Sequence, residues 1–267
     1  MNIYKFELKM LIRSVLIWAS GIAFGLFFYL MFFPLVMADN DAMVTVMANF
    51  PDEFLAFFGM NAELSFTSIM GYYGLTMSFM YIPIAIQASL YGVSIISVEE
   101  REYTADFLLT KPVSRKQIFM SKFFAAFTAL GIVNISIWIF SFLGLLAFNG
   151  GNEVDYVGAI VLLSTVIIMQ LFFLCVGLLL SVLVKKVTSV IGYAMGLGFG
   201  LFILSSFGEM LSIDAIKILT PYSHFEPVDI LVEGTFNWLY FSVSILVIII
   251  SFSIAYFLYQ KRNIKAL

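Results

Sequence analysis

Six stretches of the sequence carry no Asp, Glu, Lys or Arg and are each long enough to cross a membrane. A spanning helix needs about 20 mostly apolar residues. Lipid offers no hydrogen bonds to the backbone, so each stretch should be helical. The stretches are Val15–Ala38, Leu64–Val98, Phe123–Asn152, Tyr156–Val184, Val187–Gly208 and Gly234–Gln260. We therefore predict an all-α polytopic membrane protein with six transmembrane helices, forming a single transmembrane domain over residues 1–267.

The overall composition agrees with lipid as the solvent. The chain is 62% hydrophobic and 12% charged, whereas an ordinary soluble domain has about 25% charged residues. The first stretch resembles a signal peptide, but the apolar core of a signal peptide spans only about 7–15 residues. We expect this longer stretch to be retained as a helix.

The basic residues predict the orientation of the helices. If six helices alternate in direction, every Lys and Arg except Lys217 falls on one side. The excess of Lys and Arg marks the cytoplasmic side of a membrane protein. Both termini are therefore expected in the cytoplasm.

Residues 2–13 are predicted to form an amphipathic helix at the cytoplasmic surface. Cations recur every four residues along one stripe, at Lys5, Lys9 and Arg13, and apolar side chains form another at Ile3, Phe6 and Met10. Such a helix lies in the membrane interface, with its cations near anionic lipid headgroups. The alternative is that these residues are the polar start of the first span.

Two outer segments are predicted to contain short elements. Pro51 is followed by two acids, a pattern typical of the first turn of a helix, with an apolar face expected to rest on the outer membrane surface. The segment 208–234 carries two prolines and many polar groups, which disfavours a deep span and favours a partly re-entrant element. Its His224 is expected to be a structural hydrogen-bonding residue. With Cys175 as the one cysteine, no zinc site of the usual kinds is expected.

Glycines spaced by four predict a close helix contact. Gly192, Gly196 and Gly200 share one face of the fifth span, and Gly21 and Gly25 form a smaller set in the first. Small residues allow helices to approach closely in a membrane. These glycines are a possible interface between two subunits, and packing inside one chain is the alternative.

The sequence lacks the residues that several classes of membrane protein need for their function. No span has a charged residue near its centre, where ion-coupled transporters usually carry one. No HExxH motif, no paired aspartates within spans and no GxxxxGK[ST] phosphate loop occur. The chain is therefore not expected to be an enzyme or to bind a cofactor, and energy for transport should come from another polypeptide.

The largest cytoplasmic segment, residues 99–117, is predicted to form two short helices around a proline. Thr104 can cap the first helix, and Pro112 ends it because the residue before a proline avoids helical angles. Ser114 then caps a second helix, with Gln117 at the capping-box position, and this helix should run directly into the third span.

The same segment resembles the bacterial ABC-2 class, the permeases of type-2 ABC exporters. Members commonly read Glu-x-x-x-Gly-Thr-x-x-x-Leu-Leu-x-x-Pro-x-Ser-Arg between the second and third helices. The chain agrees at Glu99, Thr104, Leu108, Leu109, Pro112, Ser114, Arg115 and Lys122. It departs at Tyr103, where glycine is usual.

The resemblance implies a function and partners. The segment would be a coupling helix that docks on a separate ABC ATPase subunit, which binds ATP and Mg²⁺. Two permeases, identical or paralogous, would pair with two ATPases in the bacterial cytoplasmic membrane, surrounded by lipid and without nucleic acid. The apolar anchor would be Phe107, Leu108 and Leu109, with a charged rim of Glu99, Glu100, Arg101, Arg115 and Lys116. A secondary transporter and a non-transporting scaffold or sensor subunit are the alternatives.

Overall fold

Six helices of the computed structural model are long and apolar enough to cross a membrane. The structure describes residues 3–38, 45–46, 49–57, 67–101, 113–184 and 186–261, and no strand occurs in these ranges. The spans are α1 with α2 (Ile3–Met31 and Phe33–Ala38), α5 (Ile69–Arg101), α7 (Arg115–Phe148), α8 (Tyr156–Leu183), α9 (Val190–Met210) and α13 (Trp238–Lys261). The predicted all-α fold with six spans is confirmed.

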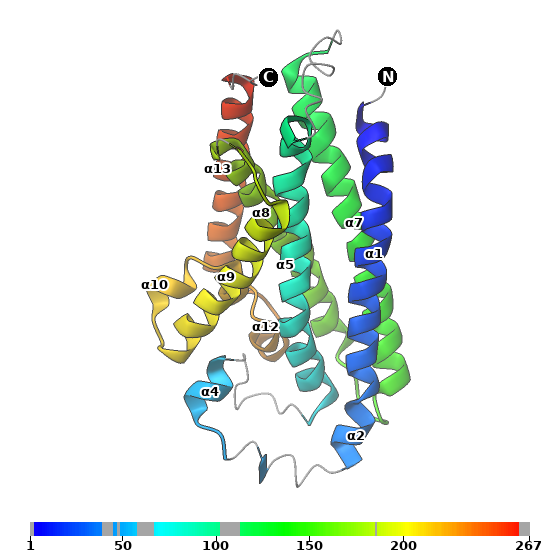
Figure 1. Ribbon diagram of the computed structural model, residues 1–267. Helices are drawn as coiled ribbons and strands as arrows, with labels where there is room; N and C mark the ends of the chain where they lie inside the picture. The colour runs from blue at the N-terminus through cyan, green and yellow to red at the C-terminus, as the bar shows by residue number, and fades with distance from the viewer. Residues whose placement is uncertain are drawn as a thin grey trace.

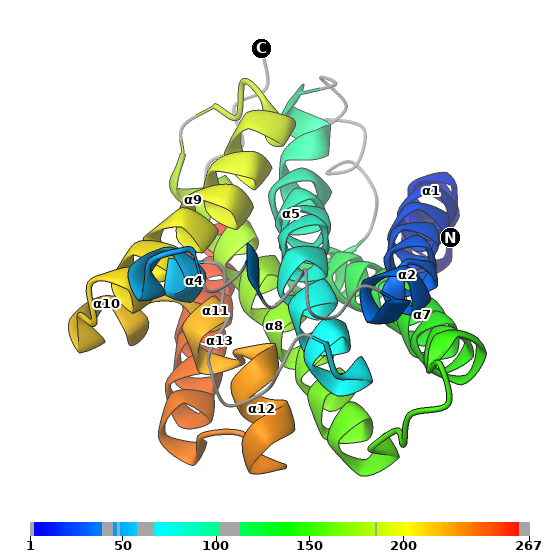
Figure 2. The same ribbon diagram turned by 90° about the horizontal axis from the view of Figure 1, so that it is seen from below.

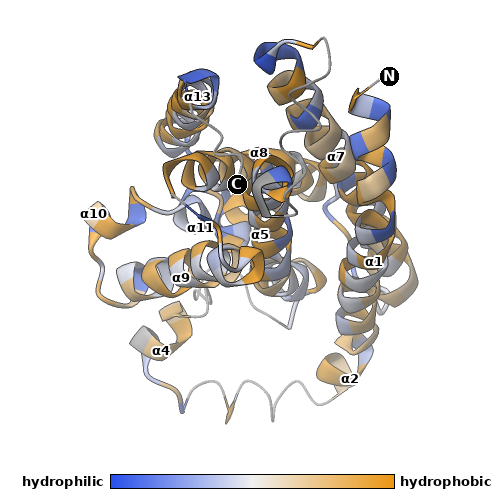
Figure 3. Cartoon of the chain, turned by 45° about the horizontal axis from the view of Figure 1, so that its top comes forward, coloured by the Kyte–Doolittle hydropathy of each residue, from blue (hydrophilic) through white to orange (hydrophobic). Residues whose placement is uncertain are grey.

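The elements that flank the motif segment lie at one end of the bundle. Figure 1 shows the start of α1, the end of α13, the end of α5 and the start of α7 together at the top, with α2 and α4 at the opposite end. Hydrophilic residues gather at the top ends of α1, α7 and α13, whereas the helix bodies are mostly apolar (Figure 3). This end of the bundle is therefore polar and the helix bodies are apolar, as expected of helices that cross a bilayer.

The helices pack in pairs that do not follow the order of the chain. α1 packs along α7, and α5 packs extensively against both α8 and α9. Seen from below, α5 and α8 lie between the α1–α7 pair on one side and α9 with α13 on the other (Figure 2). The core of the molecule is therefore centred on α5 and α8, where most of the buried side chains of the spans lie.

Glycines allow α5 and α8 to touch backbone to backbone. A Cβ atom added at Gly92 would lie 2.3 Å from the carbonyl oxygen of Leu174, and one added at Gly177 would lie 2.9 Å from that of Ser89. Real Cβ atoms do not come so close to a carbonyl oxygen. Any larger residue at Gly92 or Gly177 would force the two helices apart.

The amphipathic N-terminal segment is continuous with the first span. α1 is one unbroken helix from Ile3 to Met31, so residues 3–13 form its first turns. Ile3 and Glu7 are buried, whereas Phe6 and Met10 are exposed. The segment is thus the polar start of a long helix, and its location at a membrane surface stays a prediction.

The outer segment before α13 folds into three short helices. They are α10 (Asp214–Lys217), α11 (Pro221–His224) and α12 (Pro227–Glu233). Both prolines stand at the first position of their helix, where the missing N–H breaks no bond. α12 then ends at Gly234, whose φ of 67° suits glycine.

His224 has the structural role predicted for it. Its Nε2 lies 3.0 Å from the carbonyl oxygen of Ile218 and must donate, because a carbonyl only accepts. Its Nδ1 then accepts from the hydroxyl of Ser244 at 2.7 Å. Burial lowers the pKa of His224, and no group of three potential metal ligands is found in the described ranges.

The predicted short helix after Pro51 is also present, as α4 (Asp52–Phe57). It packs on the end of α9, where the rings of Phe57 and Phe207 meet edge to face at 5.7 Å. Its apolar contact is therefore with the protein, while Phe54 remains 44% exposed.

Candidate functional site

A buried lysine joins three helices at the base of the motif segment. The side chain of Lys122, from α7, has no exposed surface. Its ammonium group lies 2.8 Å from the carboxylate of Glu7 on α1, contacts the carboxylate of Glu99 on α5, and donates to the carbonyl of Ile95 at 2.8 Å. An ammonium has three N–H donors, so all of them have an acceptor.

Glu99 was expected at the charged rim of the docking element, but its side chain points into the protein. Its side chain is only 16% exposed and faces Lys122. It ties the end of α5 to α7 and leaves little of its surface for a partner. The rim expected for the docking element would then depend on the other charged residues.

Arg115 joins the start of α7 to the end of α13. One nitrogen of its guanidinium lies 3.5 Å from the carbonyl oxygen of Tyr259 and 3.4 Å from that of Gln260. A cation at the C-terminal carbonyls of a helix is favourable, because these groups lack partners within the helix. Together with Lys122, this contact connects the flanks of the segment to four helices.

The helix cap predicted at the start of α7 is confirmed. Ser114 has extended backbone angles, and its hydroxyl accepts a hydrogen bond from the backbone N–H of Gln117 at 3.2 Å. α7 then continues without a break into the third span. The neighbouring Lys116 is exposed to solvent.

The tip of the predicted coupling helix lies outside the described residues. The predicted anchor and the proline break belong to this part, namely Thr104, Phe107, Leu108, Leu109 and Pro112. The side chains of Glu100 and Arg101 are likewise outside the description. The structure thus describes the base of the segment, and the tip stays a prediction.

The predicted glycine faces divide into two groups. An added Cβ would meet no atom within 4 Å at Gly21, Gly196 or Gly200, and at Gly192 it would meet only Ser189 of the same helix. Gly25 instead faces α5, where an added Cβ would lie 3.5 Å from the sulfur of Met80. The face of α9 that carries Gly192, Gly196 and Gly200 is therefore open to a neighbouring molecule, whereas Gly25 belongs to packing within the chain.

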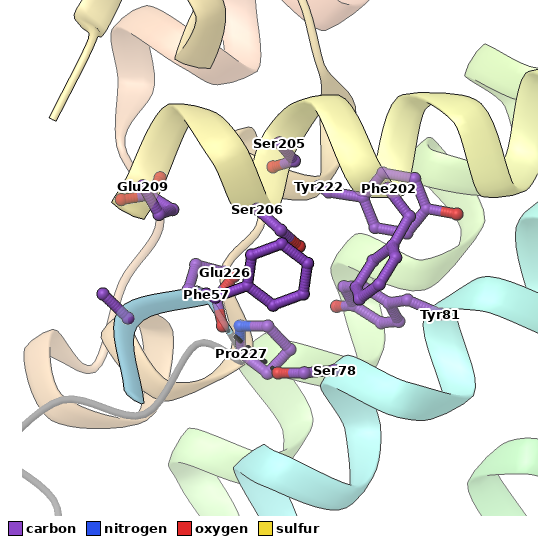
Figure 4. A pocket seen from close by; sticks show the side chains of 11 residues that line it. Phe57, Ser78, Tyr81, Phe202, Ser205, Ser206, Glu209, Tyr222, Glu226 and Pro227 are labelled. Atoms are coloured by element: carbon purple, nitrogen blue, oxygen red, sulfur yellow. Dashed lines mark hydrogen bonds between the residues drawn. The ribbon is translucent and has the colours of Figure 1, made fainter. Parts of the chain in front are cut away.

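A second polar site is a pocket toward the other end of the bundle. Figure 4 shows side chains from α4, α5, α9, α11 and α12 around it. The lining residues are Ala56, Phe57, Ser78, Tyr81, Phe202, Ser205, Ser206, Glu209, Tyr222, Glu226 and Pro227.

Sequence reasoning did not find this pocket. Nothing in the spacing of Glu209 and Glu226 along the chain indicates that they share a pocket. A signal was present in the clustering of Ser205 and Ser206 with Glu209 near the end of a span. It could not point to α5, which contributes Ser78 from a distant part of the chain.

The fold defines a multi-pass helical membrane protein. The segment between its second and third spans is held at both flanks by contacts of Glu99, Lys122 and Arg115. The family model described as ABC-2 family transporter protein matches residues 1–264, and the chain belongs to this family. No curated protein matches the chain. It is thus a permease of an ABC transporter. The family's members are membrane components distinct from the ATPase, and association with an ABC ATPase subunit follows from membership.

Proposed function

We propose that this permease is the membrane-spanning subunit of an ATP-driven exporter, and that residues 99–117 couple it to a separate ATPase subunit. The observation that carries the proposal is the bonding at both flanks of the segment. Glu99 and Lys122 join α5, α7 and α1, and Arg115 joins α7 to α13. A force applied to the segment by an ATPase would therefore be transmitted to four helices, α1, α5, α7 and α13.

The rest of the assembly follows from the same proposal. ATP and Mg²⁺ bind to the partner, since the chain has no phosphate loop of the GxxxxGK[ST] type. The end of the bundle that holds the start of α1, the start of α7 and the end of α13 (top of Figure 1) faces the cytoplasm of a bacterium, because the sequence concentrates Lys and Arg in these segments. Both termini then lie inside.

Replacing Leu108 by Asp tests the coupling role. A charge in the apolar anchor should prevent docking, because truncating an interface anchor alone typically costs more than about 1–2 kcal/mol. We expect loss of co-purification with the ATPase and loss of ATP-driven transport in vesicles, with normal membrane insertion. The matched control is Leu219→Asp in the exposed turn after α10, which should leave both unchanged.

Other outcomes would contradict the proposal. Assembly and transport by Leu108→Asp at the level of the unsubstituted protein would remove the segment from coupling. Transport that continues without ATP would favour a secondary transporter. Absence of any substrate-dependent stimulation of the ATPase would favour a scaffold or sensor subunit.

We also propose that two permeases pair through the open glycine face of α9. Gly196→Leu should keep the fold, because no atom of the chain lies within 4 Å of the added Cβ. It should separate the two subunits, which native mass spectrometry in detergent would record as a shift from dimer to monomer. Gly131→Leu on α7, which is equally open, is the control, and an unchanged dimer in Gly196→Leu would exclude this face.

A further inference from the structure

Glu226 is an acid without a cationic partner in the described part of the chain. The other pocket carboxylate, Glu209, is paired with Lys217 at 2.6 Å. No such pair forms at Glu226, whose Oε1 instead lies 3.2 Å from the hydroxyl of Ser78. The pocket therefore holds one carboxyl group that has no counter-ion.

Ser78 indicates how this carboxyl group is accommodated. Its hydroxyl has one proton and two neighbouring acceptors, the carbonyl oxygen of Gly74 and the carboxyl of Glu226, both at 3.2 Å. When the proton goes to Gly74, the Glu226 contact is favourable only if the carboxyl itself is protonated and donates. The hydroxyl of Ser78 can thus bond to Glu226 in either protonation state, donating to the ionised carboxylate or accepting from the neutral carboxyl.

Burial and the neighbouring acidic groups favour the neutral form of Glu226. Burial and then the carboxylates of Asp229 and Glu209 raise the pKa of Glu226 to about 8, against the opposing hydrogen bond from Ser78 and the charge of Lys217. Asp229 comes from α12, Glu209 from α9 and Lys217 from α10; the titratable group from α5 that faces it is Tyr81. At neutral pH Glu226 is therefore mostly protonated unless a bound cation offsets these effects.

A hydroxyl group stands beside the carboxyl group in the same pocket. Ser206 is 4% exposed as a residue and lines the pocket. Figure 4 shows it directed into the space between α9 and Phe57. Its oxygen can therefore accept a hydrogen bond from a ligand in the pocket.

Aromatic rings complete the walls. Phe57, Tyr81, Phe202 and Tyr222 line the pocket, and the rings of Phe202 and Tyr222 meet edge to face at 5.6 Å. Aromatic faces attract cations, while a carboxylate and a hydroxyl accept the hydrogen bonds of an ammonium group. Together these groups suit a cation that carries N–H donors and an apolar body.

We propose that this pocket is a binding site for a primary ammonium group attached to an apolar body, with Glu226 as its counter-ion and Ser206 as an additional acceptor. The ligand is either a soluble primary amine or the headgroup of phosphatidylethanolamine, because both carry a primary ammonium group. The proposal concerns binding alone and does not depend on which compound the transporter moves or on its coupling to ATP.

The first test is calorimetric titration of the purified protein with 2-phenylethylammonium, in nanodiscs of phosphatidylglycerol. We expect saturable binding at least tenfold tighter than that of the neutral isostere 2-phenylethanol. In nanodiscs that contain phosphatidylethanolamine, a weaker apparent affinity identifies the lipid headgroup as the competing ligand. An unchanged affinity identifies the soluble amine as the source.

Variants separate a specific site from general attraction to acidic residues. Glu226→Gln keeps the shape and should weaken binding of 2-phenylethylammonium at least tenfold, and Ser206→Ala should weaken it several-fold. Glu233→Gln, an exposed acid at the end of α12, is the matched control and should bind as the unsubstituted protein does. Size-exclusion chromatography and thermal unfolding check that each variant is folded.

The pH dependence gives an independent readout. Binding needs an ionised Glu226, so affinity should rise by up to tenfold per pH unit from pH 6 to about pH 8 and then level off. Binding at pH 7 should also release a proton, measured by titration in buffers of different ionisation enthalpy. Glu226→Gln should remove both effects.

The proposal is overturned by either of two results. One is equal affinity for 2-phenylethylammonium and 2-phenylethanol, or no binding of the ammonium compound at all. The other is an unchanged affinity and pH profile in a folded Glu226→Gln variant.

Discussion

At the scale of single residues, Lys122 shows how a charge is held inside an apolar protein. A buried ion is costly unless it is paired and its hydrogen bonds are satisfied. Glu7 and Glu99 provide the opposite charge, and the carbonyl of Ile95 takes the remaining donor. The three partners come from two other helices, so Lys122 holds α1, α5 and α7 together at one point.

Removing the ammonium group should destabilise the bundle. Lys122→Met leaves two carboxyl groups buried without their cation, and breaking a buried ion pair on one side costs about 3–5 kcal/mol. We expect a clear fall in the unfolding temperature measured in detergent. Lys116→Met, on the same helix but exposed, should change the free energy of unfolding by no more than about 0.5 kcal/mol. If Lys122→Met lowered the unfolding temperature no more than Lys116→Met does, the ion pairs of Lys122 with Glu7 and Glu99 would contribute nothing to stability.

At the scale of elements, the contact between α5 and α8 organises the core. Gly92 and Gly177 bring the two backbones together, and α9 approaches α5 in the same way at Gly198, where an added Cβ would lie 3.0 Å from the backbone nitrogen of Ile86. Van der Waals packing drives helix association in lipid, because lipid tails are as apolar as the side chains. Close contact between the backbones therefore contributes strongly to the association of α5 with α8 and α9.

A single methyl group at Gly92 tests this contact. In Gly92→Ala the new Cβ would lie 2.3 Å from the carbonyl oxygen of Leu174, so α5 and α8 must separate, at a cost of about 1–3 kcal/mol. We expect a lower midpoint in thermal unfolding followed by circular dichroism. Gly131→Ala, on a helix surface with no atom within 4 Å, should be neutral or slightly stabilising, and a neutral Gly92→Ala would show that the backbones are further apart than described.

At the scale of the whole molecule, the two ends of the bundle have different chemistry. The end that holds the start of α1 and the end of α13 carries hydrophilic residues. The contacts of Lys122 and Arg115 lie at this end as well. The opposite end carries α4, the three short helices and the pocket around Glu226. The two sites are thus separated along the bundle, and α5 contributes to both, with Glu99 at one and Ser78 at the other.

Cysteine labelling tests the orientation of these ends. In a background with Cys175→Ser, a cysteine in place of Glu153 should react with a membrane-impermeant maleimide added to intact cells, and one in place of Lys116 should react only after lysis. Both positions are exposed. Glu153 is preferable to Asp155 because Asp155 caps α8 by accepting from the backbone N–H groups of Val157 and Gly158. The opposite labelling pattern would invert the topology.

Features that depend on local pattern could be predicted from the amino-acid sequence. Apolar length and the gaps between charges predicted the six spans, because a helix in lipid must satisfy its own backbone. The Ser114 cap was predictable for a similar reason, since the hydroxyl and the N–H of Gln117 are three residues apart. The family resemblance of residues 99–122 likewise needed only neighbouring residues.

Which distant residues meet could not be predicted in this way, because it depends on how the helices pack. The four-residue glycine pattern pointed to Gly192, Gly196 and Gly200, whereas the close contact uses Gly92 and Gly177, one from each of two helices. Glu7 and Glu226 likewise looked like ordinary charges in the sequence. One became the partner of Lys122 and the other the acid of a pocket, because the packing of helices, which no local pattern encodes, selects the neighbours of each side chain.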